Sequence, residues 1–118
     1  VKAVIETAHK YDRKAMADLI CVTDIPKRAK ELEAMGMDLI SVHTAVDVQR
    51  LGNTPLDDLK ELVSAVPPSI SAVAGGISMK TIDAFKKQRP AVIIAGGSLT
   101  GAQDLRAAVM EMKNAISD

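Results

Sequence analysis

The stretch AVAGGISMK (72–80) runs from small apolar residues into two glycines and then into a polar segment, and IIAGGSLTG (93–101) repeats this pattern. Each stretch predicts a β-strand that ends in a Gly-Gly turn just before a helix. A glycine pair at this place removes two Cβ atoms, so backbone N–H groups can approach an anion closely. One such pair could serve the turn alone, but two in succession favour a phosphate site.

The rest of the chain alternates between strands and helices in the same way. Apolar runs predict strands in KAMADLICV (14–22) and MDLISVH (37–43). End signals place helices after them, with Thr23 or Asp24 as the cap of one and Thr54 as the cap of another. The order is one helix followed by four strand-helix units, which predicts parallel strands joined by right-handed crossovers.

Two architectures fit this order, a doubly wound open sheet and part of a (β/α)8 barrel. The 118 residues are about half of what a barrel of about 250 residues usually needs, so length favours the open sheet. The polar residues at the strand ends favour the barrel, where all four ends would look into one mouth.

Composition excludes several functions. The 15 basic and 15 acidic residues balance, with no basic run, so nucleic acid is not an expected partner. No apolar run reaches the roughly 20 residues of a membrane span and no signal peptide is evident, so we expect a cytoplasmic protein without membrane contact. Aromatic residues make up 2%, so methionines are expected to help fill the core, namely Met35, Met37, Met110 and Met112.

Two further residues stand at predicted strand ends, where parallel α/β proteins bind ligands. His43 closes an uncharged strand and is followed by Asp47 and Gln49, which could fix its tautomer or meet a polar substrate. We interpret His43 as a general acid or base or a substrate contact. Asp18 must be paired, bound or neutralised. Capping of the next helix is the weaker interpretation, because other residues already serve that end.

Four segments together resemble strands five to eight of 3-hexulose-6-phosphate synthase, of the orotidine 5′-monophosphate decarboxylase suprafamily: ADLICV, DLISVHTAVDVQ, ISAVAGGIS and AVIIAGGSLTGAQD. The resemblance implies an α/β chain of parallel βα units, the C-terminal half (strands five to eight, preceded by one helix) of a (β/α)8 TIM barrel. Residues 1–118 would be a single half-barrel segment of a chain of about 210 residues.

The resemblance also implies an activity. Members of the family are carbon-carbon lyases of the aldolase type, and the resemblance implies a cytoplasmic, Mg2+-dependent homodimer. The implied reaction condenses formaldehyde with ribulose 5-phosphate through an enediolate. His43 matches the strand-six histidine that moves protons, and Asp18 matches the acidic position ending strand five, so both would be catalytic. Further substrate contacts would be Thr44 and Asp47. The phosphate-binding residues would be Gly75, Gly76, Gly96, Gly97 and Ser98.

Departures from the family pattern limit what this chain can do. The alternative, 3-keto-L-gulonate-6-phosphate decarboxylase, typically has arginines where this chain has Thr44 and Gly97, which favours the synthase. The family's Asp-x-Lys-x-x-Asp motif, which holds the metal and supplies a lysine, is absent from the sequence. We therefore expect no metal ligands within this chain, the main Mg2+ ligands in the missing half, and no activity of the chain alone. Self-association or pairing with the missing N-terminal half-barrel is expected, and a non-catalytic binding or folding module remains a third alternative.

Overall fold

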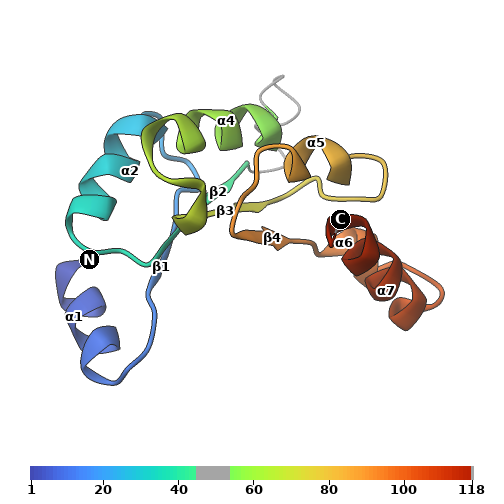
Figure 1. The fold of residues 1–118 in the computed structure, drawn as a ribbon, viewed down its shortest axis with the longest axis horizontal. Helices are drawn as coiled ribbons and strands as arrows, with labels where there is room; N and C mark the ends of the chain where they lie inside the picture. Colours follow the sequence, from blue (N-terminus) through green and yellow to red (C-terminus); the bar gives the residue numbers. More distant parts are fainter. Residues whose placement is uncertain (45–53, 118) are drawn as a thin grey trace.

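The structure is a computed structural model that describes residues 1–44 and 54–117. Strands alternate with helices along the described chain (Figure 1). The elements are α1 (Lys2–Lys10), β1 (Met16–Asp18), α2 (Ile25–Ala34), β2 (Leu39–His43), α4 (Pro55–Ala65), the 3-10 helix η1 (Pro68–Ile70), β3 (Ser71–Ala74), α5 (Ile82–Lys86), β4 (Val92–Ile94), α6 (Gly97–Thr100) and α7 (Leu105–Ile116).

The strands form one parallel sheet in the order β1-β2-β3-β4. Each connection steps to the next strand in the same direction, and right-handed crossovers then place the connecting helices on one face. In Figure 1, α2, α4 and α5 follow one another along one side of the sheet. A doubly wound sheet reverses its strand order and carries helices on both faces. The predicted α/β class with parallel strands is confirmed, and the consecutive order is that of a barrel segment, not of a doubly wound sheet.

Helix boundaries agree with the sequence signals where a cap is present. The Asp24 side chain accepts the Lys27 N–H at 3.0 Å and starts α2, and Thr54 caps α4. The helix expected directly after the Gly75-Gly76 turn begins only at Ile82. After the second turn the short α6 comes first, and the Asp104 side chain then caps the start of α7.

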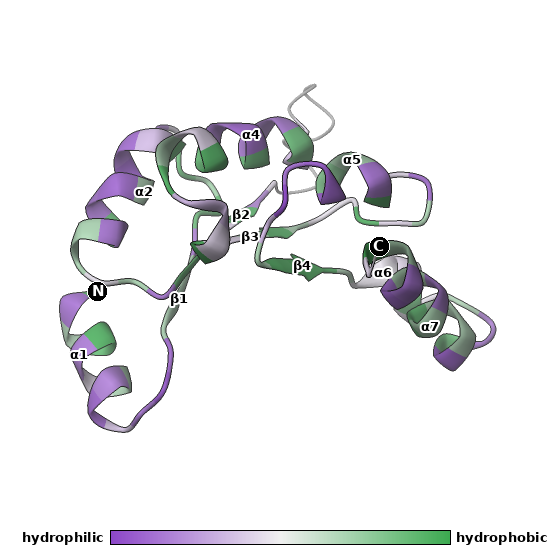
Figure 2. Ribbon diagram, in the orientation of Figure 1, coloured by the Kyte–Doolittle hydropathy of each residue, from purple (hydrophilic) through white to green (hydrophobic). Residues whose placement is uncertain are grey.

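The hydrophobic core lies between the sheet and the helices. Ile40, Val42 and Val73, at most 1% exposed, project from the strands. They belong to one core with buried side chains of α2, α4 and α5, namely Ala29, Leu32, Leu59, Leu62, Ile82 and Phe85. Figure 2 shows β1 and β4 as hydrophobic, with hydrophilic residues concentrated on the helices. This pattern is expected for strands covered by amphipathic helices.

The methionine predictions are half right. Met37 and Met112 are buried, as expected. Met35 is 39% and Met110 is 50% exposed, so the predicted core role is wrong for both. Met35 lies just after the last residue of α2. In α7, Met112 is the residue that is buried.

The face of the sheet opposite the core presents a different set of side chains. Paired residues of parallel strands point to the same face, so Asp18, Ser41 and Ala72 lie together on it. Ser41 and Ala72 are small and buried between neighbouring strands. Met16 is 51% and Ile94 is 38% exposed on this same face, at the two edges of the sheet. In the described chain this face therefore keeps large apolar side chains in contact with solvent.

Candidate functional site

The C-terminal ends of β2, β3 and β4 surround a pocket of about 430 Å3. Ligand sites of parallel α/β proteins lie at this end of the sheet. The structure brings together here His43 and both Gly-Gly turns, which are far apart in the sequence. The pocket is lined by His43, Ala74, Gly75, Gly76, Ile77, Ile94, Gly96, Gly97 and Ser98.

The two turns use glycine for different reasons. Gly75 has a φ of 93° and Gly76 a φ of 67°, a region that side chains with a Cβ rarely adopt. Gly96 and Gly97 are not among the glycines with positive φ. A Cβ added at either would meet no atom of the described chain within 4 Å. The first turn therefore needs glycine for its backbone, whereas the second leaves open space beside the pocket.

His43 is held by Asp18 across the ends of β1 and β2. The distance from His43 Nδ1 to Asp18 Oδ2 is 3.2 Å, and the other oxygen of Asp18 accepts the Ile20 N–H at 2.9 Å. A carboxylate only accepts hydrogen bonds, so Nδ1 carries the proton in neutral His43. Nε2 is then left as the basic nitrogen. Asp18 is not among the residues that line this pocket, and α2 is capped by Asp24, not by Asp18.

Thr44, another predicted substrate contact, does not line this pocket. Thr44 is 3% exposed, and its hydroxyl donates a hydrogen bond to Asp58 in the first turn of α4. This bond ties the end of β2 to the helix that follows it. Asp47 and Gln49 lie outside the described residues.

Thr81 contacts the first glycine turn and was missed by the sequence reasoning. Its hydroxyl donates to the Gly76 carbonyl at 2.9 Å and accepts the Ser78 N–H at 3.0 Å. These bonds hold residues 76–81 together, and the Ser78 carbonyl accepts the Ile82 N–H at 2.9 Å where α5 starts. A threonine directly before IDAF is an N-cap signal that could have indicated the later helix start.

The described residues do not fit Mg2+ by themselves. Within residues 1–44 and 54–117 no group of three or more His, Cys, Asp or Glu side chains could hold a metal ion. Asp18 already accepts a hydrogen bond on each of its oxygens. Mg2+ needs several oxygen ligands in octahedral geometry. The Mg2+ requirement stays a prediction for the complete barrel, and no reaction step is assigned to it.

The opposite end of the sheet has its own polar contact. Asp38 Oδ2 accepts the Ala15 N–H at 2.8 Å and lies 2.9 Å from His9 Nε2. The Ala15 N–H, and then the His9 side chain, lower the pKa of Asp38. This contact joins α1 to the segment before β2. The His9 side chain is 46% exposed although it is hydrogen-bonded.

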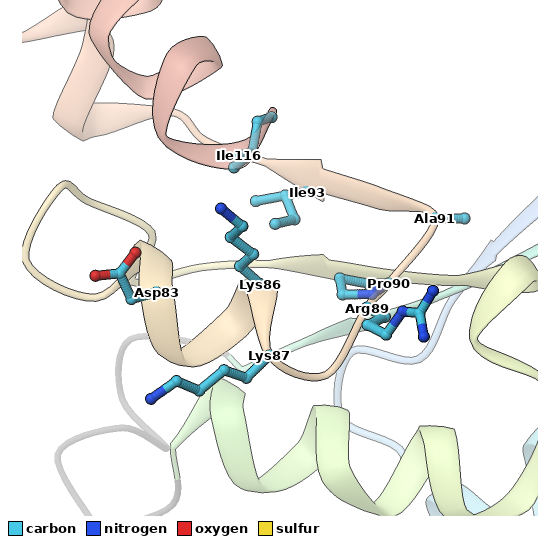
Figure 3. A pocket seen from close by; sticks show the side chains of 8 residues that line it. All are labelled: Asp83, Lys86, Lys87, Arg89, Pro90, Ala91, Ile93 and Ile116. Atoms are coloured by element: carbon cyan, nitrogen blue, oxygen red, sulfur yellow. The ribbon is translucent and has the colours of Figure 1, made fainter. Parts of the chain in front are cut away.

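A second pocket, of about 810 Å3, lies between α5, α7 and the start of β4. Its Lys86, Lys87 and Arg89 point in different directions (Figure 3). Lys86 Nζ donates to the Ala115 carbonyl at 2.9 Å. This pocket is larger, but its basic groups do not converge on one point, so it is not the candidate site.

None of the helices in the described residues is long and apolar enough to cross a bilayer.

Comparison with known proteins gives a consistent result. No family model matches the chain. It is 43% identical over 116 residues to 3-hexulose-6-phosphate synthase of Staphylococcus haemolyticus, covering 98% of this chain and 55% of that protein. The corresponding Staphylococcus aureus protein is 42% identical with the same coverage. The chain thus spans about half the length of these relatives.

Solved structures agree with the sequence comparison. A 3-hexulose-6-phosphate synthase from Salmonella typhimurium matches with a TM-score of 0.88 and 33% identity, over 98% of this chain and 55% of that chain. KGPDC from Streptococcus mutans matches with a TM-score of 0.77 and 20% identity over 98% of this chain and 53% of that chain, a likeness of fold alone. The resemblance predicted from the sequence is confirmed over nearly the whole chain.

Proposed function

We propose that this chain supplies the phosphate-binding side and one proton-transfer group of a 3-hexulose-6-phosphate-synthase-like aldolase, as strands five to eight of its barrel. The observation that supports this most is the pocket where His43 meets both Gly-Gly turns. The open space at Gly96 and Gly97 adds to it, because the described chain does not itself fill that space. A dianionic phosphate monoester suits a small cavity bounded by backbone amides.

His43 would move protons at the carbon atoms that react. Removal of a proton from C1 of ribulose 5-phosphate gives an enediolate, whose C1 then forms the new bond to the carbon of formaldehyde. The formaldehyde oxygen takes up a proton, which completes the 3-hexulose 6-phosphate. With Nδ1 bonded to Asp18, Nε2 of His43 is the nitrogen that can accept or return a proton. Asp18 is the residue that sets this tautomer.

Phosphate binding would fix the substrate relative to His43. The turns after β3 and β4 lie on neighbouring strands, and β2, which ends in His43, pairs with β3. A sugar phosphate held by the turns would therefore extend its carbon chain towards the strand that carries the histidine. Holding the reacting atoms in place accounts for a large part of the barrier reduction in such sites.

The exposed face of the sheet opposite the core, called the inner face below, supports the prediction that a partner is required. Met16 and Ile94 occupy the two edges of that face, and burying the part of each side chain that is still exposed is worth about 1 kcal/mol. Both β1 and β4 are edge strands of the described sheet, with backbone groups available for pairing. We propose that a second copy or the N-terminal half-barrel covers this face, and that the chain alone turns over little or no substrate.

The test is reconstitution. Mixing the chain with an N-terminal half that carries the Asp-x-Lys-x-x-Asp motif should give formaldehyde-dependent consumption of ribulose 5-phosphate. His43→Gln should abolish the gain, whereas His9→Gln, which changes the other histidine in α1, should retain it. No gain in any mixture would count against the aldolase. Decarboxylation of 3-keto-L-gulonate 6-phosphate by the same mixture would favour the decarboxylase instead.

A further inference from the structure

We propose that Thr81 is a positioning residue that fixes the Gly75-Gly76 turn for a phosphate monoester, an inference that rests on the proposed function. The Thr81 hydroxyl lies at the centre of the loop between β3 and α5. It donates to the Gly76 carbonyl at 2.9 Å, accepts the Ser78 N–H at 3.0 Å and lies 3.3 Å from the Ser78 hydroxyl. One side chain therefore ties Gly76 and Ser78 to the start of α5.

The bond to Thr81 sets the direction of the peptide group between Gly76 and Ile77. The described chain has no cis peptide, and in a trans peptide the C=O and N–H point in opposite directions. With the Gly76 carbonyl bonded to Thr81, the Ile77 N–H points away from Thr81. Gly76 and Ile77 both line the pocket that contains His43. The Ile77 N–H is thus placed to donate to a phosphate oxygen, whereas the Ser78 N–H is already used.

The turn needs such a restraint because of its composition. Gly75 and Gly76 both have positive φ, and glycine loses more conformational freedom on ordering than any other residue. Thr81 is itself anchored, since the next residue, Ile82, is 1% exposed in the core, and Phe85 of the same helix is 3% exposed. The core thereby holds Thr81, and Thr81 holds the turn. A turn ordered before binding reduces the entropic cost of binding the ligand.

The first experiment compares three variants by calorimetric titration of the full chain with ribulose 5-phosphate. Thr81→Val keeps the shape of the side chain but removes every hydrogen bond of the hydroxyl, and it should weaken binding about tenfold or more. Thr81→Ser keeps the hydroxyl and should restore most of the affinity. Thr7→Val is the matched control, because it removes a hydroxyl that donates to the Ala3 carbonyl at 2.7 Å in α1. It should leave the affinity unchanged.

The second experiment uses the unaltered chain and amide NMR spectra during titration with inorganic phosphate and with ribulose 5-phosphate. The Ile77 amide proton should move downfield with either ligand. If it stays in place during saturable binding, the inference is overturned, whether or not Thr81→Val folds. Equal affinity of Thr81→Val and the unaltered chain would overturn the inference and leave the phosphate site intact. Absence of any binding by the unaltered chain would overturn the phosphate site and the inference with it.

Discussion

Replacing Gly97 with alanine tests whether this glycine is required for ligand binding or for the stability of the fold. Gly97 is the first residue of α6 and does not have a positive φ. A Cβ there meets no atom of the described chain within 4 Å. Alanine is favoured over glycine in a helix, so Gly97→Ala should leave the free energy of unfolding unchanged or raise it by up to about 1 kcal/mol.

Binding should respond in the opposite direction. The added methyl group enters the pocket that Gly97 lines. Overfilling a packed site costs about 1–3 kcal/mol, so the Kd for ribulose 5-phosphate should rise about 5- to 150-fold. Urea unfolding and calorimetric titration of the same preparation give the two values. We expect Gly97→Ala to be a stable protein that binds poorly.

Gly36→Ala is the matched control for this comparison. Gly36 has a φ of 86° after the end of α2, with no atom within 4 Å of an added Cβ, and it does not line the pocket. It should lose about 1–2 kcal/mol of stability, because alanine is strained in the left-handed region, and it should bind normally. Unchanged affinity of Gly97→Ala would refute the reasoning. A loss of its stability would show that the second turn also needs glycine for its backbone.

Three further predictions concern the polar contacts. Because the pKa of Asp38 is lowered, its stabilising contribution is complete above the ordinary value and is lost as the pH falls through the lowered one. The urea midpoint of the unaltered chain should therefore fall more steeply with acidification below about pH 4 than that of Asp38→Asn. Nitrogen-15 NMR should find neutral His43 with its proton on Nδ1 and neutral His9 with its proton on Nε2, and Asp18→Ala should lower the Nδ1–H fraction of His43 only. Thr44→Val should lose about 1–3 kcal/mol of stability in urea unfolding, because it removes the hydroxyl that donates to the part-buried Asp58 carboxylate on α4, whereas Thr44→Ser should lose less.

Much of the fold could be predicted from the sequence because its signals are local. Apolar runs, the caps at Asp24 and Thr54, and the Gly-Gly turns each depend on a few neighbouring residues. The exposure of Met35 and Met110 could not be predicted this way, because helical spacing does not show which neighbours are present to cover a side chain. The start of α5 was also missed, because the Thr81 side chain bonds back to Gly76 and does not cap the helix, a contact that no local pattern shows.

The sequence was enough to predict which strand ends form the candidate site, but not which of their side chains bond to one another. Parallel strands bring their C-terminal ends to one edge, so His43 and both glycine pairs were expected together, and they line one pocket. The bond between Asp18 and His43 depends on β1 pairing with β2 in register, which no local pattern contains. The role of Thr81 depends on a side chain reaching back across its own loop.

Each strand of this sheet pairs with the next strand along the chain. The pairings that order β1 to β4 therefore each span one strand-helix unit of 20 to 31 residues, and none of them requires the first and last strands to meet. We expect the sheet and its outer helices to form within one kinetic phase, before the exposed inner face meets any partner. The glycine turns would then be in place early, and assembly around Met16 and Ile94 would be a later, concentration-dependent step.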